Sequence, residues 1–321
     1  MELSVVIPSY RSGKLVGRAI DSVLAEGVAP ENVIVVEDGV FDETASVVHA
    51  RAGVRLVSLE KNGGAPHARN VGLEQVATRY VMFLDADDYV ADGLLTGLTD
   101  VLEQEHADLA IGPWRYHGED RQPGRLRVPE KLSNAEWILT WTRPRMSFFP
   151  PCSVAWNADS LRRIGGWDRR LKKNQDGELM IRAFLKGLSV AVSTRGHGVY
   201  WQHASPHRVT NAKIDDLLHA TDIIFRQLET WARSPAQQDL PANNRAALGR
   251  YCCVTAWHAF AHGRKESGRQ WMAKARDFGF YRRGYNNKTA LLAAFLGVSL
   301  SSKARAGFER SGLFYKLRYK R

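Results

Sequence analysis

The stretch Tyr80-Val-Met-Phe-Leu-Asp85-Ala-Asp87-Asp88 joins a continuous apolar run to three carboxylates in four positions. A run of this kind is typical of a strand that a sheet covers on both faces. In an open α/β sheet, ligands bind beyond the carboxyl ends of the strands, where these acids are expected. Clustered like charges are unfavourable there unless a cation neutralises them, and a divalent metal carrying a diphosphate does so. The stretch therefore predicts a buried strand with a metal site at its end.

A second interpretation of these acids needs no metal. Asp87 or Asp88 would cap a helix expected over 91–105, because an Asp that precedes a helix accepts hydrogen bonds from its first N–H groups. The motif alone leaves both interpretations open.

Strands and helices alternate along most of the chain. Short apolar runs predict strands, and apolar residues that recur every three or four positions predict helices. This alternation is typical of a mainly parallel, doubly wound sheet flanked by helices, so we expect an α/β fold. The expected strands are 3–7 (stopping at Pro8), 33–36, 54–59, 81–84, 107–111 and 190–192, and the expected helices are 15–24, 44–52, 66–77, 91–105 and 178–186.

The pattern changes twice further along. Prolines and tryptophans interrupt it between about 113 and 175, and from about 214 only helices are expected, over 214–231, 243–262 and 268–278. We therefore expect a first domain over 1–212 and a helical C-terminal region over 213–321.

Composition narrows the class of protein. The chain has 321 residues, of which 44% are hydrophobic and 25% charged, as is ordinary for a globular protein. A net charge of +11 favours anionic partners. Nucleic acid is not expected among them, because we find no recognised binding motif and the acidic clusters would repel phosphates without metal. Three cysteines without a disulfide pattern, and a strand that begins directly after Met1, predict a cytoplasmic protein without a leader.

Two more expected strand ends carry polar groups. Glu37 and Asp38 end the strand over 33–36, where a carboxylate suits a nucleobase imide or a ribose hydroxyl; the alternative is a plain turn capped by Asp42. A glycine-rich turn over 62–64 precedes a helix that carries Arg69 in its first turns, and these groups suit an anion. The turn lacks the G-x-G-x-x-G spacing of dinucleotide sites.

Later segments supply a candidate base and a candidate metal ligand. Asp176 lies at the start of the helix over 178–186 and suits a general base, although an Asp at a helix start is also a common N-cap. His197, His203 and His207 lack the spacing of a zinc site. Either one of them joins carboxylates around Mn²⁺ or Mg²⁺, or the segment is a polar loop.

Taken in order, these pieces resemble the family 2 glycosyltransferases, which have the GT-A fold. Four positions depart from the family pattern: Arg11 replaces Asn, Glu37 replaces Asp, Val40 replaces Ser, and Gln175 replaces the first acid of an E-D pair. The resemblance covers about residues 1–210. The matching segments are 5–11, 36–42, 62–70, 85–88, 165–176 and 200–203.

The resemblance implies a GT-A catalytic domain with a nucleotide-binding half over about 1–112 and an acceptor-binding half over about 113–212. Mn²⁺ or Mg²⁺ would be the cofactor. The implied roles are those of nucleotide contacts for Pro8, Tyr10, Asp38, Arg69 and Asp85, metal ligands for Asp87 and His203, and catalytic base for Asp176, with Glu178 as the substitute base.

The implied reaction is inverting transfer of a sugar from a nucleoside-diphosphate donor to a hydroxyl of a glycan or lipid-linked acceptor, in polysaccharide or glycoconjugate assembly. Asp38 suits uracil, so a UDP-sugar is the first donor to expect, with thymine nucleotides still open. A nucleotidyltransferase is a poorer match, because its glycine-rich basic loop is missing after residues 3–7. The changes at Arg11, Glu37 and Gln175 leave open a degenerate protein that only binds nucleotide-sugar or glycan, although Asp38, Asp87 and Asp176 all remain.

The C-terminal end has a composition of its own. Its last twenty residues hold seven Lys or Arg and one acid, with aromatic residues between them. This pattern predicts a helix that lies on an anionic membrane surface, such as the inner face of a plasma membrane. The alternative is an ordinary helical end with a solvated basic face.

Overall fold

The computed structural model describes residues 1–40, 42–119, 122–141, 149–203, 213–234 and 242–278. The chain divides into two compact units. One comprises Met1–Trp137 with Phe148–Asn211, and the other comprises Ile138–Ser147 with Ala212–Arg321. The expected division by function, into a nucleotide-binding half, an acceptor-binding half and a helical C-terminal region, stays a prediction.

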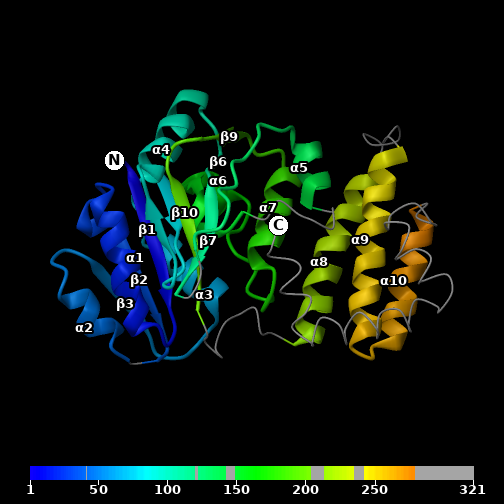
Figure 1. Ribbon diagram of the computed structural model, residues 1–321, viewed down its shortest axis with the longest axis horizontal. Helices are drawn as coiled ribbons and strands as arrows, with labels where there is room; N and C mark the ends of the chain where they lie inside the picture. The colour runs from blue at the N-terminus through cyan, green and yellow to red at the C-terminus, as the bar shows by residue number, and fades with distance from the viewer. Residues whose placement is uncertain (41, 120–121, 142–148, 204–212, 235–241, 279–321) are drawn as a thin grey trace. The chain divides into compact units, whose positions relative to one another are not determined.

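The first unit is built on a seven-stranded sheet in the order β3-β2-β1-β4-β8-β6-β9 (Figure 1). Its pairs are parallel except those of β8, which runs antiparallel to both β4 and β6. The prediction of a mainly parallel α/β sheet is therefore confirmed. The strands are β1 (Leu3–Ser9), β2 (Val33–Asp38), β3 (Arg55–Leu59), β4 (Tyr80–Phe83), β6 (Leu109–Ile111), β8 (Val154–Asn157) and β9 (Val190–Val192).

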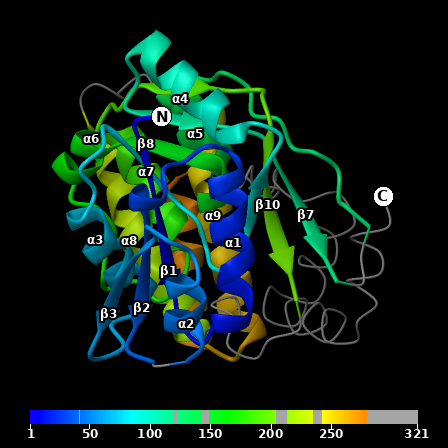
Figure 2. The same cartoon turned by 90° about the vertical axis from the view of Figure 1, so that its left-hand side faces the viewer.

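Helices pack on both faces of this sheet. Apolar side chains of α1 (Gly13–Ala25) and α4 (Leu94–Glu105) share one buried core with alternate residues of β1, β2 and β4. On the other face α3 (Ala65–Glu74) lies so close that a Cβ at Gly72 would come within 2.2 Å of Val6 Cγ1. Glycine is therefore required where α3 meets the sheet. Figure 2 shows β1, β2 and β3 side by side, with α1 and α3 around them.

A second sheet of three strands carries part of the site. It has the order β5-β10-β7, with β5 at Tyr89–Ala91, β10 at His197–Gln202 and β7 at Trp114–Gly118. β10 is antiparallel to β5 and parallel to β7, and pairs Val199 with Tyr89. The interpretation of the histidine segment as a loop is wrong from His197 to Gln202. Since β5 follows the acidic stretch directly, this pairing brings β10 beside those acids.

Several boundaries differ from the sequence expectation. β1 continues through Pro8 to Ser9, because β1 pairs with β4 only as far as Val6↔Phe83, so the missing N–H of Pro8 costs no ladder bond. Residues 113–175 contain more regular structure than expected. They hold β7, β8, α5 (Asn134–Trp141) and α6 (Ala158–Arg163), and the expected helix over 178–186 is α7 (Gln175–Leu185). The remaining helix of this unit, α2, spans Thr44–His49.

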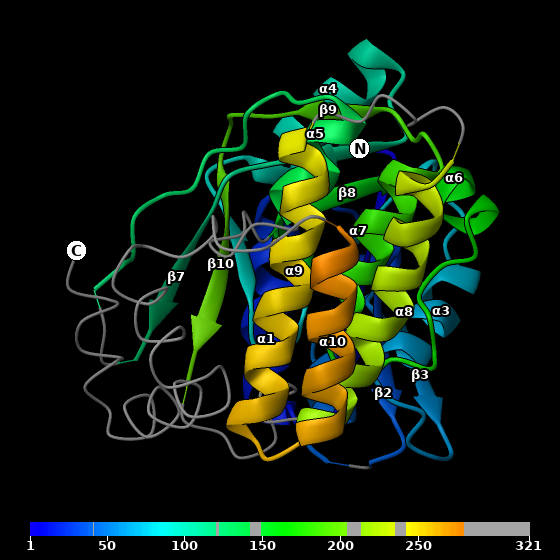
Figure 3. The ribbon, with the colours of Figure 1, turned by 90° about the vertical axis from the view of Figure 1, so that its right-hand side faces the viewer.

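Besides the end of α5 from Ile138 on, the second unit contains three helices in the part that the structure describes (Figure 3). They are α8 (Ile214–Ala232), α9 (Ala242–Ala261) and α10 (Lys265–Asp277), in agreement with the helices-only expectation. Phe225 packs edge-on against Trp271 and Phe278, with ring centroids 5.3 and 5.7 Å apart. No helix among the described residues is long and apolar enough to cross a bilayer. The basic tail lies outside the described residues.

The first unit offers a test of local stability at the start of α4. Glu26 accepts hydrogen bonds from the N–H groups of Gly93, Leu94 and Leu95, with N···O distances of 2.8, 3.2 and 2.7 Å. Glu26→Ala removes the acceptor for all three donors. We expect it to lower the free energy of unfolding by about 1–2 kcal/mol in urea denaturation. Glu31→Ala, at an exposed acid, is the control; equal stability of the two variants would contradict the capping role.

Candidate active site

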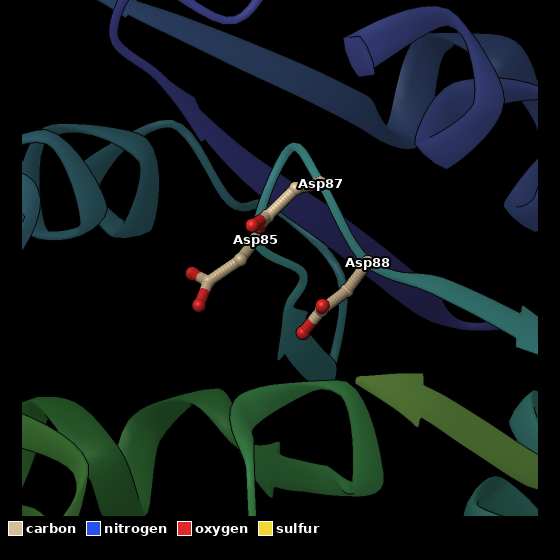
Figure 4. A group of neighbouring side chains, drawn as sticks. All are labelled: Asp85, Asp87 and Asp88. Carbon is tan, nitrogen blue, oxygen red and sulfur yellow. The ribbon is translucent and has the colours of Figure 1, made fainter. Parts of the chain in front are cut away.

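Three carboxylates gather where β4 ends. Asp85, Asp87 and Asp88 each offer an oxygen, and these oxygens lie within 4.8 Å of one another (Figure 4). The alternative in which Asp87 or Asp88 caps the following helix is wrong. Gly93 occupies the N-cap of α4, and Glu26 binds its first N–H groups.

Asp88 is the most deeply buried of the three, with 1% of its surface exposed. Its Oδ1 accepts a hydrogen bond of 2.8 Å from the backbone N–H of Trp201. Its Oδ2 is buried and has no hydrogen-bond donor among the residues that the structure describes. Burial, and then the charges of Asp87 and Asp85, raise the pKa of Asp88 well above its usual range.

Asp87 and His203 lie together. His203 Nε2 is 3.0 Å from Asp87 Oδ2, so β10 delivers the histidine to the acidic loop. Oxygen donors with one imidazole suit Mn²⁺ or Mg²⁺, and Asp88 Oδ2 is a buried acceptor without a donor among the described residues. These residues therefore fit a divalent cation. The individual roles of Asp87 and His203 stay predictions, and His207 lies outside the described residues.

Arg69 connects the acids with the candidate base. Its Nη2 is 2.5 Å from Asp85 Oδ1, and its Nη1 donates to Gln175 Oε1 at 2.9 Å. Its guanidinium carbon lies 4.3 Å from the ring centroid of Trp167, and Arg69 is 6% exposed. Because a guanidinium is planar and forked, one side chain can make all three contacts. Arg69 therefore joins α3, the end of β4 and the start of α7.

Asp176 is the second residue of α7 and is partly buried. It is not the N-cap, which is Asn174. Burial raises the pKa of Asp176 to about 6, against the lowering influence of Arg69. A carboxylate with this pKa is ionised near neutral pH and is basic enough to take a proton.

Glu178 is unsuited to replace Asp176. Its oxygens accept from Arg182 Nε at 2.8 Å and Arg182 Nη2 at 2.9 Å, and its side chain is 1% exposed. The same arginine donates to the carbonyls of Ile164 and Gly166. Glu178 thus holds the turn before α7 in place.

Three of the residues expected to contact the nucleotide, Pro8, Tyr10 and Asp38, lie at the carboxyl ends of β1 and β2. Asp38 is 2% exposed, and its two oxygens accept from the N–H groups of Gly63 and Gly64 at 2.8 and 2.9 Å. Tyr10, with 38% of its surface exposed, follows β1, and Pro8 is within it. Each carboxylate oxygen can accept a further bond, so the nucleobase role of Asp38 stays a prediction.

Arg11 stands where the family pattern has Asn. Its φ of 53° lies in the left-handed region, which Asn enters more readily than Arg does. Its guanidinium carbon is 5.3 Å from the ring centroid of Tyr10, so the arginine covers one side of that ring.

The sequence did not identify two side chains that the structure places at the site. Trp167 stacks on Arg69. The backbone N–H of Trp167 donates to Asn70 Oδ1 at 2.9 Å, and Asn70 Nδ2 donates to the carbonyl of Trp167 at 2.8 Å. Arg18 donates to the carbonyl of Asp87 at 2.6 Å. Trp167 lies within segment 165–176, which matches the family pattern, so the sequence could have indicated it. Arg18 occupies an ordinary position in an amphipathic helix, and the local pattern carries no signal for it.

Residues 4–164, half of the chain, match the family described as Glycosyl transferase family 2. An uncharacterized glycosyltransferase, EpsJ of Bacillus subtilis, is 30% identical over 148 residues, which are 45% of this chain and 41% of that protein. The poly(ribitol-phosphate) beta-N-acetylglucosaminyltransferase TarP of Staphylococcus aureus is 33% identical over 126 residues, or 37% of this chain and 38% of that one. The chain thus spans less than half of the length of these curated relatives.

Solved structures share the fold. The crystal structure of S. aureus TarS 1–349 in complex with UDP-GlcNAc has a TM-score of 0.64 and 20% identity, and the match covers 97% of this chain and 92% of that one. The expected GT-A architecture is thereby confirmed. With the family match over residues 4–164, the chain belongs to glycosyl transferase family 2.

Proposed function

We propose that this protein is a metal-dependent, inverting glycosyltransferase that moves a sugar from a UDP-sugar to a hydroxyl of a glycan or lipid-linked acceptor. One observation carries the proposal. Arg69 links the three-carboxylate cluster at Asp85 to Gln175, the neighbour of the partly buried base Asp176. A cation-binding edge and a proton acceptor are what displacement of a nucleoside diphosphate requires.

Asp85, Asp87, Asp88 and His203 would hold the cation and orient the donor diphosphate. The chemistry that Mn²⁺ or Mg²⁺ supplies when bound is stabilisation of the charge that develops on the leaving diphosphate. Asp88 is almost fully buried, so water has little access to this member of the cluster. A drier site strengthens every charge interaction within it.

Asp176 would take the proton from the acceptor hydroxyl while that oxygen attacks the anomeric carbon. A single displacement from the side opposite the leaving group inverts the configuration of that carbon. Gln175 does not impair this role, because its amide oxygen still accepts the hydrogen bond from Arg69. The substitution of Gln for Glu is therefore compatible with a working site.

The donor and acceptor classes rest on separate arguments. Asp38 at the end of β2 suits the imide of uracil, and TarS 1–349, which has the same fold, was crystallised with UDP-GlcNAc. TarP is named for transfer to poly(ribitol-phosphate), and a glycopolymer acceptor agrees with the net charge of +11 here. We propose a cytoplasmic site of action in polysaccharide or glycoconjugate assembly, with peripheral membrane contact through residues 289–321.

The direct test is incubation of the protein with UDP-sugars, Mn²⁺ or Mg²⁺ and candidate glycans, followed by NMR of the product. We expect metal-dependent release of UDP and a product whose anomeric configuration is opposite to that of the donor. Nucleotide binding without transfer to any acceptor, or to water, would instead support the degenerate binding protein.

The base assignment predicts a selective loss in Asp176→Asn. We expect kcat to fall by about 10²- to 10⁴-fold, because the amide cannot take the proton. Calorimetry should show UDP binding close to that of the wild type. Asp159→Asn, at an exposed acid of α6, is the control. Loss of UDP binding together with activity would indicate that Asp176 has a structural role instead.

The pKa of Asp176 predicts the acid limb of the pH profile. The ionised form is the active base, so kcat/KM should be constant above the pKa of about 6 and should fall as pH decreases through it. Well below this pKa, kcat/KM should fall about tenfold for each pH unit. The profile is measured between pH 4.5 and 8 at saturating metal. A rate that stays constant down to pH 5 would contradict this assignment.

The membrane proposal predicts that flotation with anionic liposomes depends on the tail. The full chain should float with vesicles that contain phosphatidylserine, and a chain that ends at residue 288 should not. Equal flotation of the two proteins would overturn the proposal.

A further inference from the structure

We propose that Arg18 is a positioning residue of the candidate metal site, because its guanidinium sets the separation between Asp87 and His203. The inference rests on the proposed function, in which these two residues hold the cation. It concerns a side chain of α1, far from both residues in the sequence.

Arg18 contacts both segments that supply the candidate ligands. Its Nη2 donates to the backbone carbonyl of Asp87 at 2.6 Å. Its guanidinium carbon lies 4.0 Å from the ring centroid of Trp201 in β10 and 4.8 Å from that of Tyr89 in β5. One planar group therefore rests on the acidic loop and on two neighbouring strands.

Trp201 connects Arg18 with the segment that ends in His203. It precedes His203 by two residues, and its backbone N–H donates to Asp88 Oδ1 at 2.8 Å. His203 Nε2 in turn lies 3.0 Å from Asp87 Oδ2. A shift of Arg18 would thus move the carbonyl of Asp87 and the end of β10 independently, and would open the gap between the two ligands.

The cost of holding Arg18 there indicates a specific use. Its Nε is buried, with no acceptor among the part of the chain that the structure describes. Burial lowers the pKa of Arg18, and the charges of Tyr89, Asp88 and Asp87 act in the opposite direction. Tyr89 is fixed by a contact of 3.0 Å between its hydroxyl and His117 Nδ1. The planar face of the guanidinium contacts two aromatic rings while its Nη2 donates to Asp87, and lysine has no planar face to stack.

Charge and geometry act in opposite directions on metal affinity. The positive charge of Arg18 repels a cation, so its removal alone would strengthen binding. Loss of the contacts to Asp87 and Trp201 would weaken binding, because ligands bind a metal best when they are held in place. Arg18→Lys retains the charge and loses the planar contacts, so it isolates the geometric effect.

The test is titration of the full chain with Mn²⁺ in the presence of UDP. Free Mn²⁺ is measured by its electron paramagnetic resonance signal. We expect Arg18→Lys to raise the Kd for Mn²⁺ about tenfold, with one site per chain retained. The matched control is Arg51→Lys, because Arg51 forms a two-bond ion pair of 2.6 and 2.7 Å with Asp21 on the exposed side of α1. Its Kd should equal that of the wild type.

Two results would overturn the inference while the proposed function stands. One is a Kd for Arg18→Lys equal to that of the control. The other is a reduced number of sites with an unchanged Kd, which is the signature of a partly unfolded variant. Failure of the wild type itself to bind Mn²⁺ with any nucleotide would overturn the proposed function, and this inference with it. As a further readout, excess Mn²⁺ should restore most of the turnover of Arg18→Lys.

Discussion

Mutual repulsion among three carboxylates at the end of β4 is the constraint on which this site depends. Their oxygens lie within 4.8 Å, and one of the acids is almost fully buried. The acids are held by groups from two distant segments, α3 and the end of β10, which the chain must bring together before the acids can stay close. Arg69 pairs with Asp85, and the backbone N–H of Trp201 donates to Asp88. His203 contacts Asp87. The same repulsion leaves the cluster in need of further positive charge, which a divalent cation supplies.

Arg69 extends this constraint to the proposed base. It shares its donors between Asp85 and Gln175, and it stacks on Trp167, which Asn70 fixes at both its backbone N–H and its carbonyl. The turn before α7 is thereby anchored to α3. Asp176 follows Gln175 directly, so the position of the base depends on the same arginine that compensates the acids. A change at Arg69 would act on the base and on the cluster together.

The sequence predicted six of the seven strands of the main sheet, because those six are short apolar runs that alternate with amphipathic helices. It missed β5, β7, β8 and β10, which carry aromatic or polar residues and pair with strands far away in the chain. It proposed Asp87 and His203 as partners only through the family resemblance, and the pairing of β10 with β5 is the physical reason that they meet. Arg18 was beyond prediction, since its contacts depend on tertiary packing alone. The hydrogen bonds that Asp38 accepts from the glycine turn were also beyond prediction, for the same reason.

The most direct test of the central claim is calorimetric titration of the wild-type protein with UDP, once in Mn²⁺ and once in EDTA. Three clustered acids repel a diphosphate when no cation is present and attract it through a bound cation. The account predicts binding in Mn²⁺ and at least a large loss of affinity in EDTA. Equal affinity for UDP in the two buffers would contradict it, because the acids would then have no part in holding the donor.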